Sequence, residues 1–124
     1  MISAAPARRF MTLIYKLVAA DEWRAAQATG AYPGSAADRA DGFIHFSTAA
    51  QAPGTAAKWF AGRTDLMLVA VEAEALGENL RWEASRDGAL FPHLFAPLPI
   101  GAVRWSRPLR LGAEGRHDFG RLEG

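Results

Sequence analysis

One histidine lies on a short apolar segment where its neighbours could share a ligand with it. In the run GFIHFS, strand alternation places Phe43, His45 and Ser47 on one face. Ile44 and Phe46 then point the other way, into the core. A histidine and a serine two residues apart on one face can hydrogen-bond a single ligand. The alternative is a histidine that pairs only with the backbone.

A carboxylate on a second segment could complete such a site. In residues 80–85, alternation separates Arg81 and Glu83 from Trp82, which we expect in the core. Glu83 is the best candidate for a catalytic carboxylate, because it lies within a strand. The alternative is an exposed ion pair with Arg81, and stability would hardly require such a pair.

A second histidine, His93, lies in the almost wholly apolar residues 90–99. A buried imidazole needs hydrogen-bond partners for its ring nitrogens, and an apolar setting can tune it for acid–base work or ligand contact. A structural histidine bonded to a nearby carbonyl is the alternative.

Other chemistries lack their motifs. The chain has no cysteine, which removes disulfides and thiolate chemistry and fits a reducing, cytoplasmic location. His45, His93, His117 and Glu83 are suitable ligand types for zinc, but they have no HxxxH or comparable short spacing, and His117 lies in the tail. There is no GxSxG elbow, GxGxxG run or P-loop.

Charge and hydropathy exclude two kinds of partner. The formal net charge is +1, from 14 basic and 13 acidic side chains, so duplex DNA is not an expected partner. No apolar run approaches the roughly 20 residues that span a bilayer. A small-molecule or nucleotide ligand remains the expected partner.

The elements that position these residues follow from periodicity and turn residues. A helix is expected over residues 22–28, stopped by Gly30, and another within 48–62, beginning near Pro53 with Trp59 and Phe60 packed inward. The connection 31–41 is expected to be a loop. The expected strands are residues 11–18, 42–47, 65–72, 80–85 and 101–111, with 90–95 demoted to an edge or irregular segment by Pro92.

This order predicts one small α+β domain at residues 11–111, with a mixed or antiparallel sheet of five to six strands and two short helices. Residues 1–10 are expected to be a flexible lead-in. Residues 112–124 are expected to be a polar, mobile tail.

The order of several motifs resembles one family. These are IYKL, GFIHFS, WE and FPHLFAPL, spread over residues 14–98. Together they resemble the small bacterial domain-of-unknown-function family numbered 952, over about residues 13–109. That family resembles the ADP-ribosyltransferase fold, nearest its RNA 2′-phosphotransferase branch.

The resemblance implies an enzyme that uses NAD. The early-strand polar contact corresponds to Lys16, where many family members carry histidine, and the later His-x-Ser corresponds to His45 and Ser47. Glu83 is implied as the catalytic carboxylate near the ribose carbon, with His45 holding the ribose or phosphate. Further ligand-binding residues are then implied: Tyr32 or Phe43 stacking on nicotinamide, Arg39 and Arg81 for a phosphate, and His93 on the pocket wall.

Two hypotheses from different classes stay open. The first is an NAD-using ADP-ribosyl- or phosphotransferase-like enzyme. The second is a non-catalytic module that binds a nucleotide or small metabolite, motivated by Lys16 in place of histidine. Fold resemblance alone does not decide between them.

Overall fold

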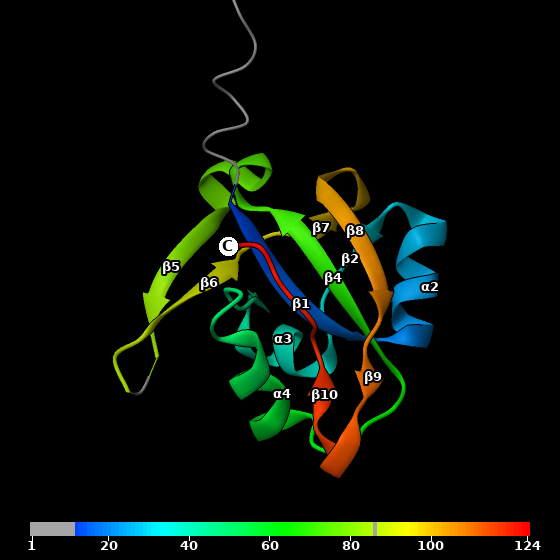
Figure 1. The fold of residues 1–124 in the computed structure, drawn as a ribbon. Helices are drawn as coiled ribbons and strands as arrows, with labels where there is room; N and C mark the ends of the chain where they lie inside the picture. The colour runs from blue at the N-terminus through cyan, green and yellow to red at the C-terminus, as the bar shows by residue number, and fades with distance from the viewer. Residues whose placement is uncertain (1–11, 86) are drawn as a thin grey trace, which may run out of the picture.

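In a computed structural model, residues 12–85 and 87–124 form an α+β domain built on antiparallel strands (Figure 1). The expected lead-in at residues 1–10 lies outside the described residues. Three strands form the central sheet in the order β1–β4–β8. They are β1 (Leu13–Ala19), β4 (Leu66–Glu72) and β8 (Val103–Pro108).

The central sheet is buried on both faces because its strands are apolar at successive positions. Ile14 and Val69 point into one core cluster, whereas Tyr15 and Leu68 point into another. Each of these side chains is fully buried. The sheet therefore separates two cores, as the two-residue period of a strand requires.

The first core is covered by α2 and by smaller sheets. Trp23 of α2 (Ala20–Thr29) packs there with Ile44 and Leu94. The two-stranded pair β2 (Ala31–Tyr32) and β7 (Leu98–Pro99) adds Tyr32 and Leu98.

The second core lies under α4 (Ala52–Trp59) and the C-terminal segment. Ala52 and Ala56 of α4 pack there with Phe119. Pro53 stands in the first turn, as predicted. The prediction that Trp59 packs inward is wrong, because it ends the helix with 69% of its surface exposed.

The second three-stranded sheet has the order β3–β6–β5, and its strands β5 and β6 form a hairpin that projects from the body (Figure 1). Its strands are β3 (Ile44–His45), β5 (Leu80–Ala84) and β6 (Leu90–Leu94). Pro92 was expected to place its segment at an edge, but β6 is the middle strand. The Pro92 carbonyl still accepts a hydrogen bond from the Phe46 amide, and Pro92 lies opposite Trp82 on the other side.

Trp82 is the second incorrect core prediction. The alternation is right, because Trp82 lies on the same side of β5 as Leu80, which packs against the first core. The hairpin extends beyond that core, however, so Trp82 is 43% exposed. A strand pattern assigns a face, but it does not say whether another layer covers that face.

The connection expected to be a loop contains a third helix, α3 (Ala36–Asp41). Ser35 caps it, since its side chain accepts from the Asp38 amide while Asp38 accepts from the Ser35 amide. Gly30 and Gly42 end α2 and α3 with φ of 95° and 89°, a conformation that glycine adopts without strain.

The expected mobile tail packs against the body. There β9 (Arg110–Leu111) pairs with β10 (His117–Asp118), and Phe119 enters the second core. The Tyr15 hydroxyl donates to the Glu123 carbonyl, so the end of the chain runs along β1 (Figure 1). Buried aromatic contacts outweigh the polar, glycine-rich composition that suggested mobility.

Short 3₁₀ segments complete the chain: η1 (Ala73–Asn79), η2 (Ile100–Ala102) and η3 (Ala113–Gly115). Among the described residues, no helix combines the length and apolar character needed to cross a membrane. The prediction of one small α+β domain is confirmed, with its strands divided among several antiparallel sheets.

Candidate functional site

A row of cationic and ionisable side chains crosses the sheet β3–β6–β5. His45 is directly opposite His93, and His93 is directly opposite Arg81. Directly paired residues on neighbouring strands project from the same face. The two imidazole centroids are 5.6 Å apart, with the rings nearly perpendicular.

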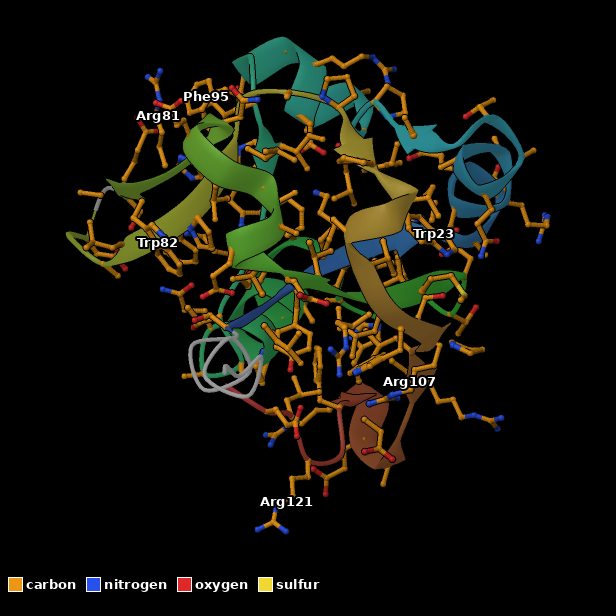
Figure 2. All side chains as sticks on the ribbon, turned by 90° about the horizontal axis from the view of Figure 1, so that it is seen from above. Trp23, Arg81, Trp82, Phe95, Arg107 and Arg121 are labelled. Atoms are coloured by element: carbon orange, nitrogen blue, oxygen red, sulfur yellow. The ribbon has the colours of Figure 1, made fainter. Side chains whose placement is uncertain are left out.

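An aromatic row lies beside it. The Phe43 ring stacks on His93, with centroids 4.1 Å apart and planes at 24°, and its centroid is 4.6 Å from that of His45. Phe95 packs against Phe43 at 5.2 Å, and the Arg81 guanidinium lies 4.9 Å from the Phe95 centroid. Figure 2 shows Arg81 beside Phe95, whereas Trp82 lies on the other side of β5.

Asp38 of α3 holds His45, the first residue of the row, through its carboxylate. Its carboxylate accepts from the His45 Nδ1 at 2.6 Å, from the Lys16 Nζ at 3.1–3.2 Å and from the Ser35 amide at 2.9 Å. The His45 amide donates to the same carboxylate. Asp38 and Lys16 are both buried, so each charge is neutralised by the other.

The protonation of this buried pair follows from its contacts. Burial on its own would raise the pKa of Asp38, but the hydrogen bond from His45, the charge of Lys16 and the Ser35 amide together hold it below its ordinary value. Burial lowers the pKa of Lys16, and the Asp38 carboxylate opposes that shift.

The second histidine has its own carboxylate. His93 Nδ1 lies 2.8 Å from Oε1 of Glu83. If Nδ1 donates to Glu83, the other ring nitrogen, Nε2, is left with its lone pair, and it has no partner among the described residues. Glu83 remains 41% exposed at its side chain. This is the arrangement by which a carboxylate orients an imidazole that acts as a base.

A hollow of about 280 Å³ opens next to the aromatic row. Phe43 connects the hollow with the histidine row, since it lines the hollow and contacts both histidines. The Arg39 guanidinium, also on the wall, donates to the Gly34 carbonyl at 2.6 Å. The hollow is at the small end of ligand sites, enough for one ring with its substituents. Its walls come from two segments: Pro33, Asp38, Arg39, Gly42, Phe43, Leu94, Phe95, Ala96 and Pro97.

Three of the candidate residues are buried away from this face. Lys16 contacts Asp38, as described, and Ser47 hydrogen-bonds Thr55 of α4 at 2.9 Å. Ser47 leaves the ladder of His45 because the chain there turns to pair with Tyr15 of β1. The shared face expected for Phe43, His45 and Ser47 therefore extends only to the first two.

Tyr32 is the third buried candidate. Its ring meets Trp23 edge-on in the first core, with centroids 6.1 Å apart. The hydroxyl makes no hydrogen bond of ordinary geometry with another described residue. Burial raises its pKa, and the charges of Asp38 and Glu22 add to the shift.

The sequence reasoning missed Asp38 and Asp41, because residues 31–41 were expected to be a loop. The signal was present: Ser35 followed three residues later by Asp38 is a capping-box pattern, which predicts a helix start. That a capping carboxylate also neutralises Lys16 and orients His45 has no local signature, since Lys16 is 22 positions away and His45 lies on a different element.

Metal ligation has no geometric basis in the described part of the chain. Over residues 12–85 and 87–124, no group of three or more histidine, cysteine, aspartate or glutamate side chains is arranged to hold an ion. The imidazoles of this face instead contact carboxylates: His45 contacts Asp38 and Asp41, and His93 contacts Glu83.

Comparison with known proteins finds one matching family. The model of the family described as "Protein of unknown function (DUF952)" matches residues 17–106. No curated protein matches the sequence.

Two solved structures of protein CC0527 from Caulobacter crescentus are similar to this one. Its crystal structure is 56% identical, covers 86% of this chain and 94% of that one, and superposes with a TM-score of 0.83. Its solution NMR structure is 57% identical, with coverage of 86% and 91% and a TM-score of 0.78.

Proposed function

Because this chain belongs to the DUF952 family, which is described as being of unknown function, we propose its activity from the site: it is a transferase that uses a nucleotide of the NAD type. The observation that carries the proposal is the row His45–His93–Arg81, with each histidine paired to a carboxylate.

The face suits such a ligand in three ways. Phe43 and Phe95 offer flat apolar surface for a planar ring. Arg81 and Arg39 offer guanidinium groups for phosphate. Glu83 offers a carboxylate near the position where a ribose would lie beside that ring, and it is exposed enough to approach a ligand.

The chemistry can be assigned to the two pairs. As the bond between nicotinamide and ribose breaks, its electron pair leaves with neutral nicotinamide and positive charge develops on the ribose carbon. The Glu83 carboxylate stabilises that charge. An acceptor oxygen then bonds to the ribose carbon, and its proton passes to Nε2 of His93. His45, fixed by Asp38, holds the ribose or a phosphate.

The hollow limits how the ligand is held. A volume of about 280 Å³ takes one ring and its substituents rather than a whole dinucleotide. We therefore expect one half of the nucleotide to enter beside Phe43 and the remainder to lie over the open face of the sheet.

The test is release of nicotinamide from NAD by the purified protein, followed by chromatography. The variants His45→Gln and Glu83→Gln should each lower the rate by about 10²-fold or more. His117→Gln is the matched control, because His117 instead contacts the Arg63 carbonyl. Absence of both turnover and saturable binding at millimolar NAD would dispose of the proposal.

A second function, a non-catalytic nucleotide-binding module, is favoured by one observation. Lys16 and Ser47, two residues that the family resemblance assigns to the ligand, are buried and contact Asp38 and Thr55 instead. A thermal shift with NAD or a mononucleotide, without nicotinamide release, would support the module over the enzyme.

A further inference from the structure

The His45 ring lies between two carboxylates of one short helix. Nδ1 is 2.6 Å from Asp38, and Nε2 is 3.0 Å from Oδ2 of Asp41. Both ring nitrogens can donate together only when the ring is protonated. The Nδ1 contact is a hydrogen bond, whereas the Nε2 contact is a close approach at ion-pair distance. With a proton on both nitrogens, the imidazole is cationic and Nε2 directs an N–H toward the group that lies there.

The two carboxylates differ in accessibility. The Asp38 side chain is 3% exposed, and its charge is already engaged by buried Lys16. The Asp41 side chain is 56% exposed. Asp41 can therefore leave Nε2 and be solvated by water at little cost, whereas Asp38 cannot.

Charge counting around the ring points the same way. Lys16 and protonated His45 carry two positive charges, and Asp38 and Asp41 carry two negative charges. Without Asp41 at Nε2, one positive charge is uncompensated at the end of the row that continues through His93 to Arg81, in which Glu83 is the carboxylate partner of His93. That surplus suits an anionic group brought by a ligand.

We propose that Nε2 of His45 binds a phosphate group of the ligand, and that Asp41 is an internal competitor that occupies the same nitrogen and sets the affinity. The proposal builds on the proposed function, because it assigns the nucleotide's phosphate to a particular atom. Asp41 acts here as a specificity-determining residue, since its carboxylate mimics the anion that replaces it.

The experiment is titration of the protein with inorganic phosphate, observed through the imidazole nitrogens of His45, His93 and His117 by NMR. Asp41→Asn removes the competing charge and should tighten phosphate binding about two- to five-fold. The change should appear at His45 Nε2. Asp118→Asn is the matched control, because it removes one exposed carboxylate charge far along the chain, on β10.

His45→Gln should abolish the site, with a loss of about ten-fold or more. The amide spectrum of this variant, compared with that of the unaltered protein, shows whether the fold is kept. The Asp41→Asn measurement tests the proposal even if His45→Gln does not fold. Unchanged phosphate affinity in Asp41→Asn, or an equal gain in Asp118→Asn, would overturn the proposal.

The two proposals fail in different ways. If NAD is neither bound nor turned over but Asp41→Asn tightens phosphate binding at His45, the transferase proposal is wrong and the anion-site proposal is supported. If nicotinamide is released but phosphate binding does not depend on Asp41, the transferase proposal is supported and the proposal that Asp41 competes for His45 is wrong.

Discussion

The two three-stranded sheets of this protein use similar strands for different purposes. The sheet β1–β4–β8 is covered on both faces, and its β4 residues Leu68, Val69, Ala70 and Val71 are wholly buried. The sheet β3–β6–β5 has one face on the core and presents the other to solvent. Only a sheet with one open face can hold two histidines and an arginine in a row without burying unpaired charge.

Lys16 joins the two regions. It lies on β1, between the core residues Ile14 and Val18, yet its ammonium group reaches Asp38 below the His45 row. Lys16 is the one charged residue of β1, and its charge balances a carboxylate beneath the second sheet.

The largest expected effect comes from breaking this link. Asp38→Ala leaves Lys16 buried without a partner, and we expect a loss of about 3–5 kcal/mol in the free energy of unfolding. Urea denaturation measures it. Adding Lys16→Met should recover part of the loss, because it removes the unpaired charge. A loss below about 1 kcal/mol would show that the pair contributes little.

The same substitution in the two sheets compares them directly. Leu68→Ala in β4 should cost about 2–5 kcal/mol, because Leu68 is fully buried. Leu90→Ala in β6 should cost only about 0.5 kcal/mol, since that side chain is 55% exposed. Similar losses for the two variants would mean that Leu90 is packed as tightly as Leu68.

The pH dependence of stability should depend on Asp38. Its pKa is lowered in the folded chain, so its stabilising effect is complete above the unfolded value of about 3.9 and is lost as pH falls below it. Between about pH 5 and pH 2, the free energy of unfolding should therefore fall further in the unaltered protein than in Lys16→Met/Asp38→Asn. Parallel curves for the two proteins would contradict this prediction.

Glu83→Gln should change stability only slightly. The Glu83–His93 pair is partly exposed, so its loss should alter the free energy of unfolding by about 1 kcal/mol or less. Nicotinamide release should nevertheless fall strongly if Glu83 acts as proposed. A large loss of stability instead would make Glu83 a structural residue.

Local patterns in the sequence were sufficient for several elements. The apolar runs of β1 and β4 specify buried strands, and Gly30 specifies the end of α2, because these choices depend on neighbouring residues. The alternation in GFIHFS correctly separated Phe43 and His45 from Ile44 and Phe46. Site residues on the same strand were therefore within reach of prediction.

Local patterns did not predict the features whose environment depends on distant segments. Pro92 is tolerated in a middle strand because its carbonyl, not its nitrogen, meets Phe46. Trp82 and Trp59 are exposed because no layer covers their parts of β5 and α4. Ser47 does not share the face of His45, because its backbone pairs with Tyr15 and its hydroxyl hydrogen-bonds Thr55.

The sequence alone determined the α+β class, the main strands and the candidate residues His45, Glu83 and His93. Strand periodicity depends only on the types of neighbouring residues, so it can be recognised without tertiary contacts. Only the tertiary structure decided that these residues meet, that Asp38 and Asp41 flank His45, and that Lys16 is buried. Such contacts join residues up to dozens of positions apart, and their strength depends on burial and on which charges share the same space.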